Sequence, residues 1–336
     1  MASNENKIQI INKKKLPKRS PIYDTYWRFA TERQAIFFKR FRKELPPWTN
    51  DLVLRLFKFT NVYRASDRVS QYLIQSVIYD SPHDEKNLFF RILLFKIFNK
   101  IETWELLQKK IGTITIENFS YTIFDNILRH AMDNGQAIYS GAYIMASGQS
   151  SFGHKKKHQN HLSLIEKMLE DHVYQQLQEC KSMQEVYLLF LSYPTIGEFL
   201  AYQYATDMNY SSLTNFSEND FVKAGPGAKD GILKCFSDLG DYSFEDVICM
   251  MADTQQIEFK RLDLDFKNLW GRPLQKIDCQ NIFCEVDKYS RMVHPEALGH
   301  SNRTRIKQKY IPRWKKNIEL FYPPKWNINH LIHQNE

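Results

Sequence analysis

The segment SYPTIGEFLAYQYATD, residues Ser192–Asp207, joins two apolar stretches through a Pro-Thr-Ile-Gly turn. A glycine at the end of such a turn lets the backbone approach another group closely, and the first N–H groups of the next helix can then face a phosphate. The same turn could also join two core helices without any ligand. Both interpretations predict a helical hairpin that bends at Gly197, so the segment indicates a helical fold.

The composition also favours helices over sheets. The chain has 336 residues, of which 43% are hydrophobic and only 12 are glycine and 12 proline. Apolar residues recur with helical spacing at 23–43, whereas 87–100 is apolar on nearly every side, as in a central core helix, and 120–133 is a further expected helix. We therefore expect a mostly α protein with at most a few short strands. A strand pair is expected at 257–266, and 137–148 fits either a short strand or a buried helix.

The two ends of the chain are basic, whereas its middle is acidic. Residues 1–45 contain 12 Lys and Arg against 4 Asp and Glu, and residues 301–336 contain 8 against 2. Basic ends favour a polyanion, most often nucleic acid, although solvated termini have the same composition. We expect a basic disordered arm at 1–20, a helical domain at 21–300, as one body or as two lobes at about 21–135 and 136–300, and a basic extension at 301–336.

Several classes of protein are disfavoured by the sequence. There is no apolar run long enough for a membrane span, and the first residues lack the apolar core of a secretory signal. The five cysteines form no CxxC pair, so we expect a cytoplasmic protein without membrane contact, cofactor or metal. His154, His158 and His161 share a helix face, but the lysines between them disfavour a metal ion. No feature indicates a protein partner.

A second glycine turn lies in AGPGAKDG, residues 224–231. Gly225, Gly227 and Lys229 could hold a phosphate at the start of the helix that follows, or the loop could simply begin that helix. The pattern GxxxxGK[ST] is absent from the chain, so nothing indicates a nucleotide-dependent kinase.

Carboxylates that could do chemistry occur in two further motifs. FSENDF, residues 216–221, places Asp220 near a helix start, where it could serve as a cap or as a catalytic acid. KIDCQNIFCEVDKYSR, residues 276–291, places Asp278 and Glu285 on one helix face, and Lys288 and Arg291 follow on nearly the same side. A solvated amphipathic helix is the other interpretation of this second motif.

Polar and aromatic residues are dense in PPWTND, residues 46–51, and in FKFTNVYRASDR, residues 57–68. Such a mixture could line a pocket for a nucleobase, or it could form a buried ion-pair network that joins helices. The candidate pocket residues are Trp48, Asn61, Arg64, Asp67 and Arg68.

Taken together, these motifs resemble the alpha-glutamyl/putrescinyl thymine pyrophosphorylases, a family of phage and bacterial proteins that is related to the helical domain of 5-hydroxymethyluracil DNA kinases. The resemblance spans about residues 26–291. It implies a fold like that of helix-hairpin-helix DNA glycosylases and, as substrates, DNA pyrimidines with large 5-substituents. In those glycosylases the catalytic aspartate follows the hairpin glycine by about twenty residues. Asp220, 23 residues after Gly197, is therefore the first candidate, and Asp278 and Glu285 are alternatives.

The resemblance implies a DNA glycosylase that acts on double-stranded DNA with modified bases. We expect it to excise hydroxymethyl- or glucosyl-pyrimidines from phage DNA by base flipping, to leave abasic sites and to serve in antiviral defence. Gly197, Gly225, Gly227, Lys229, Lys288 and Arg291 are the expected DNA contacts. The alternative is a transferase in which an amino acid or polyamine displaces pyrophosphate from activated 5-hydroxymethyluracil in DNA. A module that binds modified DNA without chemistry is the third hypothesis.

Overall fold

In the computed structural model, which describes residues 14–311 and 318–332, nearly all regular structure is helical. Within these residues the only sheet pairs β1 (Lys18–Arg19) with β2 (Phe236–Asp238) in antiparallel orientation. The prediction of a mostly α protein with a few short strands is confirmed, while most of the expected arm at 1–20 lies outside the described residues. The α-helices are α1 (Tyr23–Phe41), α2 (Leu52–Leu56), α3 (Arg68–Tyr72), α4 (Glu85–Phe98), α5 (Ile101–Ile111), α6 (Tyr121–Asp133), α7 (Gln149–Phe152), α8 (Lys157–Glu170), α9 (Val173–Glu179), α10 (Met183–Leu191), α11 (Glu198–Met208), α12 (Pro226–Cys235), α13 (Phe244–Arg261) and α14 (Lys276–Val293).

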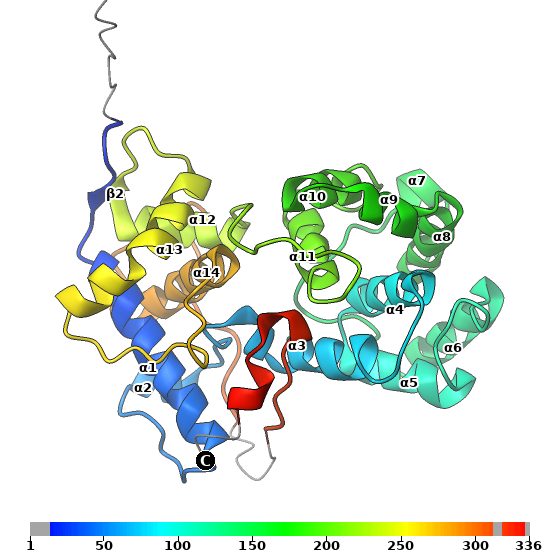
Figure 1. The fold of residues 1–336 in the computed structure, drawn as a ribbon, viewed down its shortest axis with the longest axis horizontal. Helices are drawn as coiled ribbons and strands as arrows, with labels where there is room; N and C mark the ends of the chain where they lie inside the picture. Colours follow the sequence, from blue (N-terminus) through cyan, green and yellow to red (C-terminus); the bar gives the residue numbers. More distant parts are fainter. Residues whose placement is uncertain (1–13, 312–317, 333–336) are drawn as a thin grey trace, which may run out of the picture.

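The helices form two groups that lie side by side (Figure 1). One group contains α1, α2 and α12 to α14, and α1 packs against both α12 and α14. The other group contains α4 to α11. Helices from both expected ranges, about 21–135 and 136–300, therefore occur in each group. The chain crosses from the first group to the second through the short helix η1 (Arg64–Ser66), α3 and the π-helical turn η2 (Leu73–Ile78).

Helix α4 forms the centre of the second group, as its apolar sequence predicts. The side chain of Asp84 caps its first turn by accepting the Asn87 N–H at 2.8 Å. The helix ends at Asn99, whose φ of 48° is in the left-handed region that terminates helices. Almost every side chain between these two caps is buried, so α4 packs against neighbours on all sides.

The segment from Ser192 to Asp207 forms the turn that follows α10 and most of α11, and the two helices pack against each other. Thr195 takes a φ of 70° in the turn, and α11 begins directly after Gly197. Ile196 is buried, whereas Gly197 and Glu198 are exposed. The bend therefore lies at the surface, and the rest of α11 runs inward through a completely buried stretch from Leu200 to Met208.

Two local predictions are wrong. The stretch 257–266 is not a strand pair, because α13 continues to Arg261. A capping box of Ser243 and Asp246 starts this helix. Buried Val247, Met251 and Phe259 form its apolar face, which continues into the stretch that was expected to be a strand. The stretch 137–148 is neither strand nor helix; it is an irregular connection that is held by bonds such as Ser140 N–H to the Phe98 carbonyl at 2.9 Å.

The three histidines of the 154–161 segment are tied to protein groups. His158 Nε2 lies 2.7 Å from Asp125 Oδ1, and both side chains are buried. His161 bonds to the Tyr139 hydroxyl at 2.8 Å and to the Ala146 carbonyl at 2.8 Å. Within 14–311 and 318–332, no group of three metal-ligating side chains is present.

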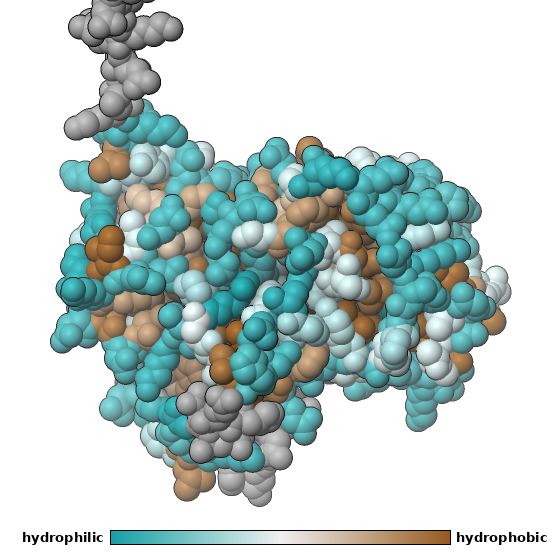
Figure 2. All heavy atoms as spheres, in the orientation of Figure 1, coloured by the Kyte–Doolittle hydropathy of each residue, from teal (hydrophilic) through white to brown (hydrophobic). Residues whose placement is uncertain are grey.

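The visible surface is mainly hydrophilic, with hydrophobic side chains in separated patches (Figure 2). Among the helices of the described residues, none is both long and apolar enough to cross a bilayer.

Helices α12 and α14 approach each other closely at a glycine. A Cβ on Gly231 would lie 2.1 Å from the Phe283 carbonyl oxygen and 2.7 Å from its carbon. Both atoms belong to backbone, so neither can rotate away, and only a residue without a side chain allows this contact. The first group of helices thus depends on a glycine in the interior of α12.

We predict that Gly231→Ala destabilises the protein despite the better helix propensity of alanine. Overpacking typically costs about 1–3 kcal/mol, which exceeds the gain of at most about 1 kcal/mol from replacing a helical glycine. Urea unfolding followed by circular dichroism measures the difference. Gly141→Ala is the matched control, because a Cβ there meets no atom within 4 Å. An unchanged midpoint for Gly231→Ala would contradict the close approach of the two helices.

Candidate functional site

Two of the polar sequence motifs meet in space although more than 200 residues separate them. The Arg64 N–H donates to Asp278 Oδ1 at 2.9 Å, and the Thr60 N–H donates to Glu285 Oε2 at 3.0 Å. Between these bonds, Asn281 Nδ2 donates to the carbonyl of residue 61 at 2.9 Å. The segment 60–67 is therefore fastened along α14, and we call this contact region the candidate site.

Asp278 and Glu285 serve as anchors in this region. Asp278 Oδ2 also accepts the Gln275 N–H at 3.0 Å, in the capping box that starts α14. Burial raises the pKa of Asp278 to about 7, with a further contribution from Glu218. Glu285 forms an ion pair with Lys288 at 2.6 Å. Both carboxylates are thus committed to backbone or ionic partners.

Asp67 differs from these two carboxylates because part of it is open to solvent. Its Oδ1 accepts the Asn61 N–H at 2.7 Å, and the residue is half-buried. Among the described residues, no hydrogen bond or ion pair ends on its other oxygen, and that atom is not enclosed. Burial raises the pKa of Asp67 to about 7, although the Asn61 N–H and the cations Arg33 and Arg64 oppose the shift. An accessible carboxyl with a pKa near neutrality is suited to acid–base chemistry.

Arg64 lies in a buried ion-pair network, as one of the two interpretations of the motif at 57–68 predicted. Its Nη1 is 2.7 Å from Asp207 Oδ1, and Lys96 Nζ is 2.7 Å from Asp207 Oδ2. Its Nε also donates to Gln203 at 2.9 Å and its Nη1 to the Tyr210 hydroxyl at 3.0 Å. Burial would raise the pKa of Asp207, but the two cations outweigh it and lower that pKa below its usual value.

The two glycine-containing turns, which precede α11 and α12, lie next to each other. A Cβ on Gly225 would touch the ring of Phe199 at 2.6 Å, and Gly225 is buried. Gly227 is half-buried and faces Cys284 of α14. Exposed Glu198, the first residue of α11, lies 3.5 Å from Lys223. Each turn thus begins a helix at one junction between the two helix groups.

The other predicted residues are more dispersed. Asp220 is exposed and takes part in no side-chain bond among the described residues, and Arg68 is exposed. Lys229 lies over the ring of Phe244 at 5.7 Å, and Arg291 pairs with Asp287. Trp48 is buried and donates from Nε1 to the Glu44 carbonyl at 2.7 Å.

Trp48 lies between two pockets that open on different faces of α1. The smaller, which we call the Arg33 pocket, has a volume of about 420 Å³. It is lined by Arg33, Arg40 and Arg55 and by aromatic side chains that include Trp48 and Tyr310. Asn61 connects it to the candidate site, since its Oδ1 accepts from Arg33 Nη2 at 2.6 Å and its N–H binds Asp67.

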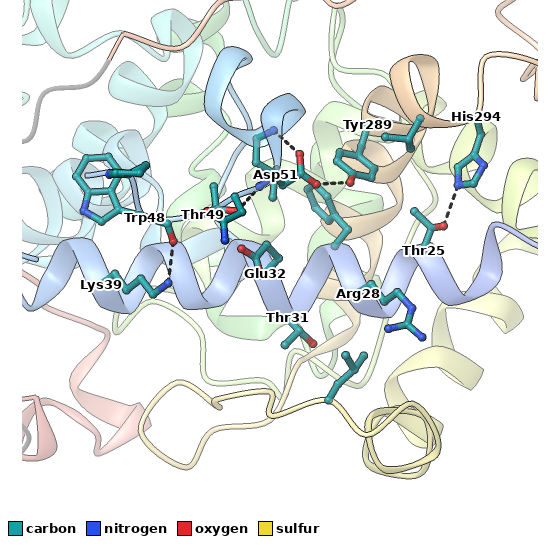
Figure 3. Close-up of a pocket in the computed structure, with 16 residues that line it drawn as sticks. Thr25, Arg28, Thr31, Glu32, Lys39, Trp48, Thr49, Asp51, Tyr289 and His294 are labelled. Atoms are coloured by element: carbon teal, nitrogen blue, oxygen red, sulfur yellow. Dashed lines mark hydrogen bonds between the residues drawn. The ribbon is translucent and has the colours of Figure 1, made fainter. Parts of the chain in front are cut away.

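The larger pocket has a volume of about 820 Å³, and several of its polar groups bond to one another (Figure 3). Lys39 donates to the Trp48 carbonyl at 2.9 Å, and Thr25 bonds to His294 at 2.9 Å. The Tyr289 hydroxyl donates to Asp51. No side-chain atom that lines it is buried without a partner in the described residues. This pocket therefore gives no indication of a missing ligand.

We predict that Asp278→Asn reduces stability by about 1–3 kcal/mol, the cost of leaving one buried donor unpaired. The two N–H groups at Asp278 need two acceptors, whereas an amide offers one acceptor and one donor. Urea unfolding measures the loss, and exposed Asp220→Asn is the control, which should stay within about 0.5 kcal/mol of the parent. If Asp278→Asn unfolded like the parent protein, its role as an anchor would be refuted.

Comparison with known proteins finds relatives that match most of the chain. Residues 20–299 match the family model described as 5-hmdU DNA kinase, helical domain. A 5-hmdU DNA kinase from Bacillus phage SP10 is 29% identical over 290 residues, which cover 80% of this chain and 45% of that protein. The chain thus spans less than half the length of this relative, and no solved structure matches it. The expected relation to the helical domain of 5-hmdU DNA kinases is confirmed, and this chain belongs to that family.

Proposed function

We propose that the protein is a DNA glycosylase that removes 5-substituted pyrimidines, such as hydroxymethyl- or glucosyl-pyrimidines, from DNA. The family supports DNA with a modified pyrimidine as the substrate class. The observation that carries the proposal is Asp67, a carboxyl with one anchored and one accessible oxygen and a pKa of about 7. In this proposal Asp67 takes the catalytic role for which Asp220, Asp278 and Glu285 were the sequence candidates.

The proposed mechanism is hydrolysis of the N-glycosidic bond. The enlarged base leaves the duplex and enters the candidate site, where half-buried Asn281 and Lys288 offer polar contacts. Ionised Asp67 stabilises the positive charge that develops on the sugar as the bond from C1′ to the base nitrogen breaks. The electron pair of that bond goes to the base. A water oxygen then bonds to C1′, and its proton passes through Asp67 to the departing base.

DNA would be held by positively charged groups and helix starts around this site. Gly197 and the first turn of α11 lie at the surface, and Lys223 partly neutralises Glu198 beside them. The turn with Gly227 and Lys229 lies at the same junction and would contact the strand next to the extruded base. In a cell, removal of such bases would damage phage DNA, which fits a role in antiviral defence.

A transferase remains the second candidate function, and one observation favours it. An amine that displaces pyrophosphate from an activated 5-hydroxymethyl group needs a site for the leaving anion, and the arginines of the Arg33 pocket could supply it. Released base and alkali-labile sites in modified DNA indicate the glycosylase. A mass gain that requires both pyrophosphorylated DNA and an amine indicates the transferase.

We predict that Asp67→Asn lowers the rate of base release by about 10²–10⁴-fold, the usual contribution of a positioned acid–base group. The assay uses duplex oligonucleotides with one hydroxymethyl- or glucosyl-pyrimidine and measures released base and abasic sites. Asp220→Asn is the matched control, because this aspartate is exposed and should leave the rate unchanged. The proposal fails if Asp67→Asn is folded and retains full activity.

The rate of base release should also depend on pH around neutrality. Asp67 has a pKa raised to about 7, and the proposed mechanism needs its ionised form. As the pH falls through 7, the carboxylate is protonated, so the rate should drop about tenfold per pH unit and level off above that value. Single-turnover rates from about pH 5 to 9 provide the measurement. The residual activity of Asp67→Asn should not show this drop in rate at low pH. If the drop persisted in that variant, the titrating group would be one other than Asp67.

A further inference from the structure

The Arg33 pocket contains two hydrogen-bond donors without partners. Arg33 is 7% exposed, and while its Nη2 donates to Asn61, its Nη1 has no partner in the described part of the chain. The Tyr310 hydroxyl, which lines the same pocket, is likewise enclosed and unpaired among these residues. Buried polar groups are almost always hydrogen-bonded, so two unpaired donors in one pocket indicate an absent acceptor.

The charge of the pocket indicates that this acceptor is an anion. Arg40 and Arg55 line it together with Arg33, and no carboxylate does. Burial lowers the pKa of Arg33 to about 10, which means that the nearby acids do not compensate for the loss of water around its cation. By contrast, the larger pocket on the other face of α1 contains both Glu32 and Asp51. An anionic ligand would therefore bind to the Arg33 pocket and not to its neighbour.

Basic residues continue beyond the pocket on both sides. The bridge between Phe57 and Lys309 places residues 308–310 beside the end of α2, with the Lys58 N–H bonded to the Gln308 carbonyl at 3.0 Å. Arg305, Lys307 and Lys309, which lead up to that contact, are exposed, as are Arg55 and Lys58 on the segment that it meets, whereas Arg303 pairs with Asp230 and Asp287. A small free anion would use only the pocket, whereas a polyanion could follow the whole basic strip.

We propose that the Arg33 pocket binds one backbone phosphate of a DNA strand, and that the nucleoside next to this phosphate stacks on the aromatic wall of the pocket. A phosphodiester offers only acceptors, as the two unpaired donors require. The volume of about 420 Å³ is within the range of sites for small molecules, and half-buried Phe57 and Tyr310 supply flat surfaces for a base. This inference rests on DNA as the ligand of the proposed function, but it does not require base excision.

The position of the pocket relates this contact to the candidate site. Asn61 joins Arg33 to Asp67 through bonds of 2.6 Å and 2.7 Å. Arg33 and Asn61 would thus lie between a bound phosphate and the accessible carboxyl of Asp67. DNA held in the pocket would therefore pass close to Asp67. Leu56, which lines the pocket, is 58% exposed and therefore also offers apolar surface to an unstacked base.

The test measures binding of a short unmodified single-stranded DNA to the full chain by fluorescence anisotropy. Tyr310→Phe removes only the unpaired hydroxyl, so it should raise Kd about tenfold, as expected for a lost bond to a charged group, without lowering the unfolding midpoint. Arg55→Gln should weaken binding and reduce the slope of log K against log salt by about one. Arg28→Gln is the matched control, because Arg28 lies on α1 as Arg33 does but is exposed and lines the larger pocket. This variant should bind DNA almost like the parent protein.

Two outcomes would overturn the proposal. The first is that both Tyr310→Phe and Arg55→Gln bind DNA with the parent affinity. The second is that millimolar phosphate or pyrophosphate raises the unfolding midpoint of the parent protein but not of Tyr310→Phe, while DNA stays bound to the parent protein, which would assign the pocket to a free anion. Binding is measured on unmodified DNA, which the proposed reaction does not consume. The affinity of the pocket variants therefore reports on this inference, whereas loss of excision in Asp67→Asn reports on the proposed function.

Discussion

The arrangement of the molecule depends on the buried carboxylate of Asp207. It belongs to α11, and its two oxygens contact Lys96 of α4 and Arg64 of the segment that connects the two helix groups. All three side chains are at most 4% exposed. Loss of one partner from such a buried network typically costs about 3–5 kcal/mol, because it leaves a charge that water cannot reach. The network therefore fixes the hairpin of α10 and α11, the core helix α4 and the crossing segment in one relative position.

The position of Arg64 in turn determines where the polar groups of the candidate site lie. Its side chain points into the network with Asp207, while its N–H is held by Asp278 of α14. Asn61 and Asp67, three residues before and after it, are thereby placed where the two helix groups meet. The accessible oxygen of Asp67 is thus located by a structural ion pair on one side and a helix cap on the other. Rigid support of this kind is what a catalytic carboxyl needs in order to keep its orientation and its shifted pKa.

The sequence predicted the helices well where the pattern was strongly periodic, as in 23–43, and it selected both motifs that form the candidate site. It was less informative about individual roles, because spacing along the chain does not show which carboxyl keeps a free oxygen. Asp220 satisfied the spacing from Gly197, yet the loop that carries it folds around Asn209, whose side chain bonds to both Thr214 and Phe216, and leaves Asp220 exposed. Arg33 was overlooked, although its place on the apolar face of a helix that also presents Trp27, Ala30 and Phe37 to the core was a detectable signal.

The unpaired donors and the uncompensated arginine of the Arg33 pocket lower the stability of the free protein. A sequence under selection for stability alone would replace Tyr310 by phenylalanine and Arg33 by an apolar residue, since each enclosed donor without a partner costs about 1–3 kcal/mol. A bound phosphate would recover part of this free energy, because its oxygens accept hydrogen bonds from such donors. The same reasoning applies to Asp67, where burial opposes ionisation and a positive charge on a substrate sugar would favour it. The two unfavourable features lie on either side of Asn61, and a single ligand, a DNA strand with one extruded nucleotide, would relieve both.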